Sequence, residues 1–290
     1  MKSHLKNRIK QFLPPLLFNY VNNFRNYHDF LKHSNLIKTN INLKNKHKGE
    51  KCFILGSGPS INDEDLKPLK NEIVFALNNF YVHDDFSEIM RGEVEKYYMT
   101  APIHPPQTET EWKDWFSDME HHMPKNVTLI FGISNQITTA KNIIDHHNFF
   151  LNFQKYWYYA GININDYYNY NPRDIDITRI TWIADTVSIY SLIFALYMGF
   201  NEIYLLGMDH NYIINNERNY RFYQNGIHQN NEMERTIKDA SRNKHLSFGM
   251  YKIFNQYELL SNNSHTKIYN SSRSSLLDVF KYVTFKDVIK

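Results

Sequence analysis

Cysteine is almost absent from the sequence, since Cys52 is the one cysteine among 290 residues. A single cysteine cannot form an internal disulfide, and its position inside an apolar run is typical of a buried strand in a reducing compartment. Long hydrophobic runs are missing too. The longest apolar stretches, such as residues 187–198, are shorter than the ~20 residues that a membrane-spanning helix needs. We therefore expect neither a disulfide scaffold nor a transmembrane protein.

A strong charge of one sign is also missing, because 33 Lys and Arg face 30 Asp and Glu, a formal net charge of +3. This charge is too small to indicate a nucleic-acid-binding protein. The chain starts with a basic stretch, but Pro14-Pro15 interrupts the apolar part and no small-residue cleavage site follows. A signal peptide is not expected, and the predicted location is cytoplasmic.

Several catalytic signatures are lacking as well. The sequence has no Gly-Lys-Ser/Thr phosphate loop, no Gly-x-Ser-x-Gly, no His-Glu-x-x-His, no Cys/His zinc spacing, and no Asp-x-Asp at the end of a predicted strand. The histidine pairs at 121–122 and 146–147 fall in predicted surface segments, where adjacent side chains point in different directions. The sequence therefore predicts no metal site and no cofactor.

What the sequence does contain is a globular composition, with 42% hydrophobic and 16% aromatic residues. From Cys52 onward, short apolar runs alternate with turns and helical segments. We predict strands at 52–55, 72–80, 96–102, 127–133, 203–206 and 266–270, and helices at 62–70, 185–198 and 245–261. Residues 104–122 fit a helix or a long loop, and residues 135–170 show no clear period.

The clearest unit begins at Asp185. A nearly all-apolar helix ends at Gly199, a typical residue just beyond a helix C-terminus, and is followed by a buried strand with a polar end. This order predicts an α/β fold with a mainly parallel, doubly wound sheet and helices on both faces. We expect one such domain over residues 46–290.

Residues 1–45 differ from the rest in being basic and amphipathic. Two interpretations stay open for this segment. It could rest on an anionic membrane surface, or it could be a helix packed against the main domain.

Polar residues cluster where the predicted parallel strands end, which is where ligands bind in such sheets. They follow four strands and begin the apolar helix: Gly56–Ser60, Asn78 and Asn79, Thr100, Asp209–Asn211, and Asp185, Thr186 and Ser188. A helix N-terminus favours anions. The turn GSGPS allows close backbone approach and positive φ. Each feature alone also fits a plain turn, a helix cap or a structural histidine.

Four segments, ILGSGPSI, ALNNFYV, MGFNEIYLLGMDHNY and KIYNSSRSSLLDVF, occur in an order that resembles bacterial sialyltransferases of glycosyltransferase family 42. They are also similar to the wider MptE-like group, which includes motility accessory factors and 6-hydroxymethylpterin diphosphokinases. The resemblance covers residues 51–86 and 185–280. It implies a Rossmann-like domain with a small lid, here around residues 211–247, a CMP-activated sugar as donor, and no metal.

The resemblance also implies roles for individual residues. The donor site would comprise Gly56, Ser57, Gly58, Ser60, Asn78, Asn79, Thr100, Thr186, Ser188 and Asp209. Asn211 stands where the family has the first of two phosphate-binding tyrosines, and Tyr212, Tyr220 or Tyr223 could supply a hydroxyl instead. The position of the family's catalytic histidine holds Phe248. The general base is then His245, which we favour because it lies nearest that position, or His210.

The sequence thus predicts a metal-independent, inverting glycosyltransferase that uses a CMP-activated sialic acid, or a related nonulosonate or Kdo, in bacterial surface glycan synthesis. The acceptor would be a glycan or glycolipid, residues 1–45 could contact the inner membrane, and an oligomer is compatible with the sequence. The alternatives are an MptE-like diphosphokinase using ATP and Mg²⁺, and a non-catalytic nucleotide-binding scaffold.

Overall fold

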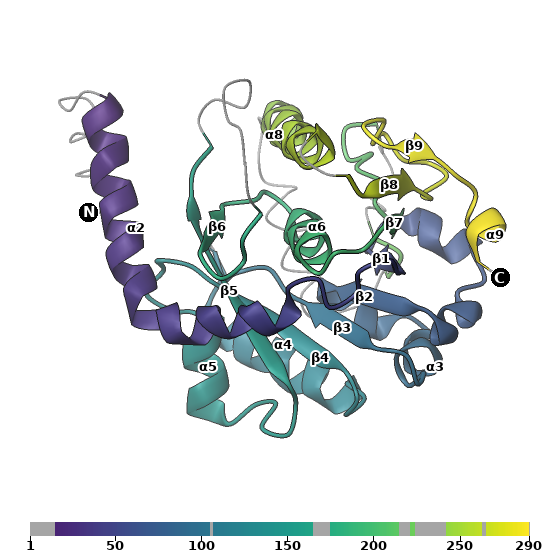
Figure 1. Ribbon diagram of the computed structural model, residues 1–290, viewed down its shortest axis with the longest axis horizontal. Helices are drawn as coiled ribbons and strands as arrows, with labels where there is room; N and C mark the ends of the chain where they lie inside the picture. Colours follow the sequence, from purple (N-terminus) through teal and green to yellow (C-terminus); the bar gives the residue numbers. More distant parts are fainter. Residues whose placement is uncertain are drawn as a thin grey trace.

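The computed structural model describes residues 15–104, 107–164, 175–214, 221–223, 242–262 and 265–289. These residues form a nine-stranded sheet in the order β6-β5-β4-β3-β2-β1-β7-β8-β9, with every neighbouring pair parallel (Figure 1). The strands are β1 (Lys51–Leu55), β2 (Ile73–Leu77), β3 (Lys96–Met99), β4 (Thr128–Ile133), β5 (Lys155–Ile162), β6 (Ile180–Trp182), β7 (Glu202–Leu206), β8 (Lys267–Asn270) and β9 (Lys281–Tyr282).

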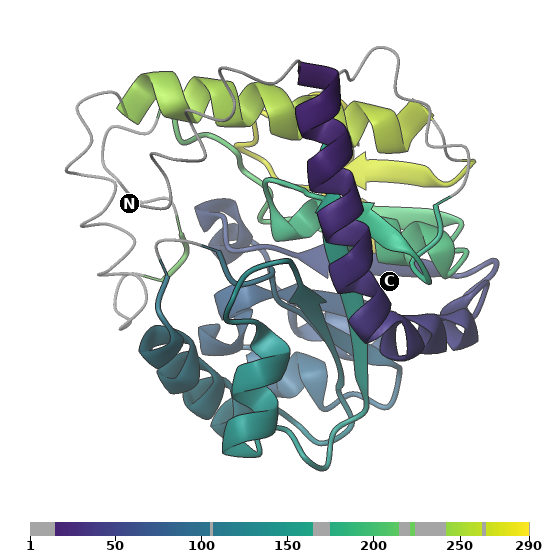
Figure 2. The same ribbon diagram turned by 90° about the vertical axis from the view of Figure 1, so that its left-hand side faces the viewer.

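Helices cover both faces of this sheet (Figures 1 and 2). Inner strands such as β1 are buried on both faces, so alternate residues such as Phe53 and Ile54 belong to two separate hydrophobic cores. One core contains side chains of α3 (Phe86–Met90), α4 (Glu109–His122), α5 (Ala140–His147) and α9 (Phe285–Val288). The other contains α6 (Val187–Tyr197) and α8 (Arg242–Asn262). The predicted Rossmann-like α/β class is confirmed by this topology.

The strand order reverses direction at β1. From β1 the chain adds β2 to β6 on one side, then returns to place β7 on the other side of β1. The neighbouring strands β1 and β7 pair from Lys51 with Glu202 to Leu55 with Leu206. In open parallel sheets the loops at such a reversal diverge and leave a crevice at the carboxyl ends of the strands. The fold therefore predicts a binding site beyond Leu55 and Leu206.

The sequence interpretation needs correction between β1 and β3. Instead of one helix at 62–70, the chain forms two short 3-10 helices, η2 (Pro59–Asp63) and η3 (Lys67–Asn71), each with a proline in its first turn. A third, η4 (Asn78–Val82), follows β2. Residues 104–122 contain α4, which Thr108 and Glu111 cap reciprocally. The region 135–170, which has no clear period in the sequence, holds α5 and β5.

The N-terminal segment is a helix, α2 (Pro15–Lys38), that continues into η1 (Thr39–Leu43). Its later part packs against the domain, with Phe30, Ile37 and Leu43 buried. The Asn40 amide donates to the carbonyl oxygens of Trp157 and Ile177 at 2.7 and 2.8 Å. The packed-helix alternative thus describes this part of the segment, and a domain boundary at residue 45 remains a prediction. None of the described helices is long and apolar enough to span a membrane.

Candidate functional site

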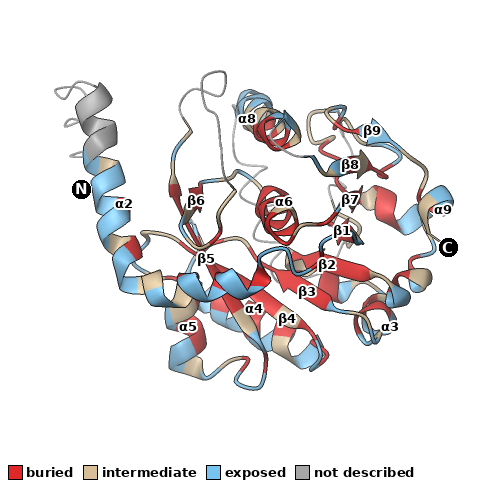
Figure 3. Cartoon of the chain, in the orientation of Figure 1, coloured by how far each residue is buried: buried red, intermediate tan, exposed pale blue. Residues whose placement is uncertain are grey.

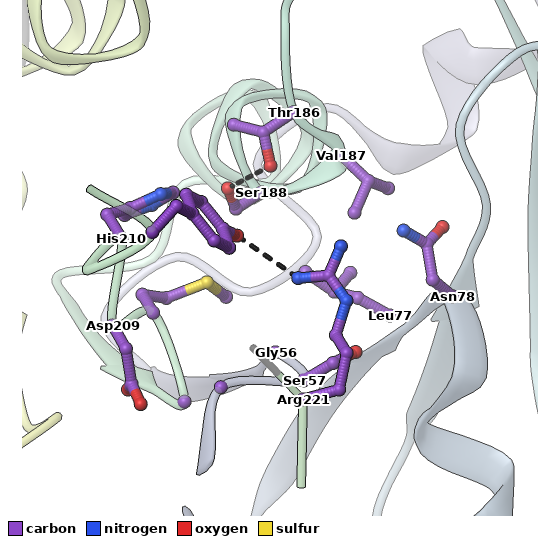
Figure 4. Close-up of a pocket in the computed structure, with 14 residues that line it drawn as sticks. Gly56, Ser57, Leu77, Asn78, Thr186, Val187, Ser188, Asp209, His210 and Arg221 are labelled. Carbon is purple, nitrogen blue, oxygen red and sulfur yellow. Dashed lines mark hydrogen bonds between the residues drawn. The ribbon is translucent and has the colours of Figure 1, made fainter. Parts of the chain in front are cut away.

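A pocket of about 60 Å³ lies at the strand-order reversal (Figure 4). It is bounded by the carboxyl ends of β1, β2 and β7 and by the N-terminus of α6. Its lining consists of Gly56, Ser57, Gly58, Leu77, Asn78, Thr186, Val187, Ser188, Gly207, Met208, Asp209, His210, Tyr212 and Arg221. Eight of the fourteen site residues predicted from the sequence are thus brought together.

The glycine turn after β1 packs tightly against the end of β7. The Gly56 amide donates to the Leu206 carbonyl and the Gly58 amide to the Gly207 carbonyl, both at 2.8 Å. A Cβ on Gly58 would lie 2.5 Å from Asp209 Cγ and 2.7 Å from the Gly207 oxygen. The expected positive φ is found at Gly207 and not in this turn. These glycines are therefore required by strand packing, and their two amides are already used.

Asp209 holds this turn in place from the neighbouring strand. Its Oδ2 accepts a 2.9 Å hydrogen bond from the Ser60 amide, and its Oδ1 accepts one from the Ser60 hydroxyl. Burial raises the pKa of the Asp209 carboxyl, while these hydrogen bonds act in the opposite direction. The carboxylate therefore fixes η2 relative to β7 at the edge of the pocket.

Asn78 has a left-handed backbone, with φ 49°, directly after β2. Its carbonyl accepts a hydrogen bond from the Tyr98 hydroxyl, and its Oδ1 accepts one from the Ala101 amide at 3.4 Å. The amide nitrogen of the side chain is on the pocket side (Figure 4). Asn78 can therefore offer a hydrogen-bond donor to a ligand.

A chain of hydrogen bonds connects the start of α6 with the end of β7. Thr186 Oγ1 lies 3.0 Å from Ser188 Oγ, which lies 2.6 Å from the Tyr257 hydroxyl. That hydroxyl is 3.0 Å from His210 Nε2. Burial raises the pKa of Tyr257, so its phenol stays protonated at neutral pH. Because every hydroxyl can rotate, the direction of donation along the chain sets the tautomer of His210.

His210 is buried and adopts a φ of 46°, which is uncommon for a residue other than glycine. Burial, and less strongly the charge of Arg221, lowers the pKa of His210 to about 4. Its Nδ1 is buried and has no hydrogen-bond partner among the described residues. The imidazole is therefore neutral at pH 7, and its Nδ1 has unused hydrogen-bonding capacity.

Arg221 supplies the positive charge in the pocket lining. Its Nη1 donates to the Tyr212 hydroxyl at 3.1 Å across the pocket (Figure 4). The next residue anchors this segment, because the Phe222 amide donates to the Ser57 carbonyl at 2.9 Å. Asn79 Nδ2 also donates to the Tyr223 hydroxyl at 2.9 Å. Residues 221–223 thus place a guanidinium beside the glycine turn.

Six predicted site residues do not line the pocket: Ser60, Asn79, Thr100, Asn211, Tyr223 and His245. Ser60 and Asn79 support it through Asp209 and Tyr223, as described above. Thr100 is buried beyond β3, and its amide donates to the Ile130 carbonyl. Most of the predicted lid at 211–247, including Tyr220, lies outside the described residues.

His245 lies in the first turn of α8 and is exposed to solvent. Tyr257, which contacts His210, is twelve residues further along the same helix, a distance of about 18 Å at 1.5 Å per residue. The structure therefore places His210, and not His245, in the pocket wall.

Two polar side chains of the site were missed in the sequence, those of Arg221 and Tyr257. Arg221 falls in the predicted lid, close to Tyr220 and Tyr223, and a cationic residue next to these candidate tyrosines was the available signal. Tyr257 lies in a helix with no motif, 47 residues from His210.

No group of three or more His, Cys, Asp or Glu side chains that could hold a metal ion occurs in the described part of the chain.

Comparison with known proteins gives one likeness to report. No protein-family model and no curated protein sequence matches this chain. Among solved structures, the sialyltransferase CstII from Campylobacter jejuni, in complex with the substrate analogue cytidine-5'-monophosphate, is similar at 19% identity and a TM-score of 0.46. The match covers 81% of this chain and 85% of that one. At this level no conclusion about chemistry follows, and the fold and pocket described above rest on this chain alone.

Proposed function

We propose that this protein is a glycosyltransferase that uses a CMP-activated sugar, a sialic acid or a related nonulosonate or Kdo. The observation that carries the proposal is the pocket at the β1/β7 reversal, where a guanidinium, an amide donor, a helix N-terminus and a neutral imidazole line one cavity. The four sequence segments that resemble family 42 sialyltransferases support the same function, since three of them contribute to this pocket or its border.

The lining can hold an anionic donor by its charges. A sugar-CMP of this kind carries a phosphodiester and a sugar carboxylate, and both are anions. Arg221 offers a charge-assisted hydrogen bond, Asn78 offers an amide donor, and the N-terminus of α6 presents its dipole. Because CMP leaves as a single phosphate monoester, such fixed donors can stabilise the developing charge without further groups.

The transfer is a single displacement at the anomeric carbon. The bond from the acceptor oxygen to this carbon forms while the bond from the carbon to the phosphate oxygen breaks, with inversion of configuration. CMP carries away the electron pair, and the proton of the acceptor hydroxyl passes to a general base. We propose His210 as this general base, because it is the histidine that lines the pocket.

The pKa of about 4 makes His210 a weak base in the empty pocket. A bound dianion would offset the charge of Arg221, which contributes to the low pKa, and so raise the basicity of the imidazole. The hydrogen bond between Tyr257 and His210 determines what Nδ1 can do. If the Tyr257 hydroxyl donates to Nε2, Nδ1 carries the proton and can donate to a phosphate. If Nε2 donates to Tyr257, Nδ1 is free to accept a proton.

A nucleotide sugar is larger than a cavity of about 60 Å³. Binding therefore requires the contact between Arg221 and Tyr212 to open, since this hydrogen bond crosses the pocket (Figure 4). Arg221 would exchange its bond to a phenol for a stronger one to a phosphate or carboxylate. The acceptor, a surface glycan or glycolipid, would approach the anomeric carbon from the side opposite the leaving CMP.

The test measures thermal stabilisation of the full chain by nucleotides. We expect CMP to raise the melting temperature with and without Mg²⁺, and Arg221→Gln to lose most of this shift. Arg179→Gln, at an exposed arginine outside the pocket, is the matched control and should keep it. Stabilisation by ATP with Mg²⁺ and not by CMP would favour the diphosphokinase alternative. No response to CMP, ATP or GDP would contradict nucleotide binding altogether.

A further inference from the structure

The helix α2 has two apolar sides, and only one of them is covered by the domain. On the covered side the Asn26 amide donates to the Gly161 carbonyl at 2.6 Å, and Phe30 packs edge-on against Tyr159. Ile37 is also fully buried on this side. The spacing 26, 30, 37 places these residues on one face of the helix. This face attaches α2 to β5.

The opposite side of α2 carries a second apolar stripe that faces solvent. It consists of Val21, Phe24, Tyr27 and Leu31, which are exposed by 52%, 66%, 53% and 49%. Their spacing of three, three and four residues keeps them in one row along the helix. Figure 3 shows this part of α2 as largely exposed and at the side of the molecule. A row of large exposed apolar side chains of this kind indicates a contact surface.

The charges beside the stripe are predominantly positive. Arg25 flanks it, and Lys32 and Lys38 follow along the helix. Asp29 is the one acidic residue among residues 1–45 of the sequence, and Lys32 and the Tyr159 hydroxyl both bind it at 2.9 Å. The sequence preceding the helix adds Lys2, Lys6, Arg8 and Lys10. An apolar row inside a basic field matches the chemistry of an anionic lipid surface.

A second copy of the chain is the competing occupant of the stripe. Two copies packed through it would bring two basic segments together, and like charges oppose such a contact. An anionic surface has the opposite sign and can accept the whole helix side. We propose that this side of α2 rests on an anionic membrane, with Phe24 and Leu31 entering the boundary between headgroups and acyl chains and Arg25 near the lipid phosphates. This proposal is independent of the proposed catalytic function.

The experiment is vesicle flotation of the full chain. We expect binding to vesicles that contain phosphatidylcholine and phosphatidylglycerol, weaker binding to phosphatidylcholine alone, and weaker binding again at high salt. The double variant F24Q/L31Q should bind at least about 10-fold less, with an unchanged melting temperature. The matched control I137Q/L151Q removes two apolar side chains that are 93% and 67% exposed elsewhere, and it should bind like the unmodified chain.

A third variant, Arg25→Glu, keeps the test decisive if F24Q/L31Q unfolds. It reverses the charge of an exposed side chain beside the stripe, and it should weaken binding only to the anionic vesicles. Equal flotation of all variants would overturn the proposal. So would an absence of binding to either vesicle, or a dimer in solution that F24Q/L31Q converts to a monomer.

Discussion

His210 combines three features that a residue of purely structural importance rarely combines. Its backbone is left-handed, its imidazole is buried, and its Nδ1 has no partner in the described part of the chain. A buried polar atom without a partner costs about 1–3 kcal/mol, and a left-handed backbone adds to this. Such costs are found where a ligand or a reaction requires them. His210 is therefore the residue whose replacement tests the proposed mechanism most directly.

We predict that His210→Asn lowers the transfer rate by ~10²–10⁴-fold, the usual loss when a general base is removed. Asparagine is chosen because it tolerates a left-handed backbone and cannot accept the proton. The measurement is release of CMP from a CMP-sugar with a glycan acceptor. His245→Asn is the matched control, and it should keep the rate because His245 lies outside the pocket. Normal activity in His210→Asn with loss in His245→Asn would assign the base to His245.

At the residue scale, the sequence predicts which residues lie at the strand ends, but not how their side chains are oriented. Gly56, Asn78 and Asp209 could be predicted because each lies at or just beyond the end of a predicted strand, and the carboxyl ends of parallel strands share one edge. Their orientations were not accessible in this way. Asp209 binds Ser60, and the amides of the glycine turn bind β7, since the close approach of two strands uses these groups first. Tyr257 reaches His210 from a separate helix, a contact that no local pattern encodes.

At the scale of elements, strands were easier to predict than the segments between them. Runs such as residues 52–55 and 203–206 are apolar at every position, as strands covered on both faces must be. The sequence predicts one helix at residues 62–70, with a cap near Asn62 or Asp63. The structure has two 3-10 turns, because Pro59 and Pro68 each start a short helix and the chain must return to the sheet within a few residues.

The connection between β1 and η2 gives a prediction at this scale. Gly58→Ala should destabilise the protein by about 1–3 kcal/mol, because its Cβ would meet the Asp209 carboxyl and the Gly207 carbonyl below 3 Å. Nucleotide affinity should fall with stability, since the same turn shapes the pocket. The matched control is Gly249→Ala in α8, where a Cβ meets nothing within 4 Å. It should stabilise by about 0.5–1 kcal/mol, as alanine favours helices.

Chemical denaturation of both variants provides the measurement. A Gly58→Ala protein as stable as the unmodified chain would mean that the β1 and β7 turns can separate. In that case the glycine would be needed only for the approach of a ligand, as the sequence alone indicated.

For the whole molecule, the reversal of strand order connects fold and pocket. The neighbouring strands β1 and β7 are far apart in the sequence, since β1 ends at Leu55 and β7 begins at Glu202, yet they pair over their full length. The α/β class was predictable from the alternation of strands and helices, because that alternation favours a parallel sheet. The exact order of nine strands was not, since β5, β6 and β9 lie in segments of weak or short patterns.

The stability of the whole molecule should depend on pH through His210. Its pKa is about 4 in the folded chain, against an ordinary value of 6.5 that we expect on unfolding. The unfolded chain therefore binds a proton before the folded one, and folding is penalised as the pH falls from 6.5 towards 4. Through His210 alone, the free energy of unfolding should fall by about 2 kcal/mol at pH 5 and by about 3 kcal/mol at pH 4. Above pH 7 this group should not change it.

Urea denaturation of the full chain and of His210→Asn between pH 7 and pH 4 measures this dependence. Other groups titrate in both proteins, among them the partly buried His33 and His83, whose pKa values are lowered mainly by burial. The difference between the two proteins isolates His210, so the stability of the unmodified chain should fall more steeply with acidification. His146→Asn, at an exposed histidine, should keep the steep dependence. Parallel plots of unfolding free energy against pH for all three proteins would contradict this prediction. They would show that His210 takes up a proton as readily in the folded chain as in the unfolded one, and that burial in the pocket wall does not keep it neutral.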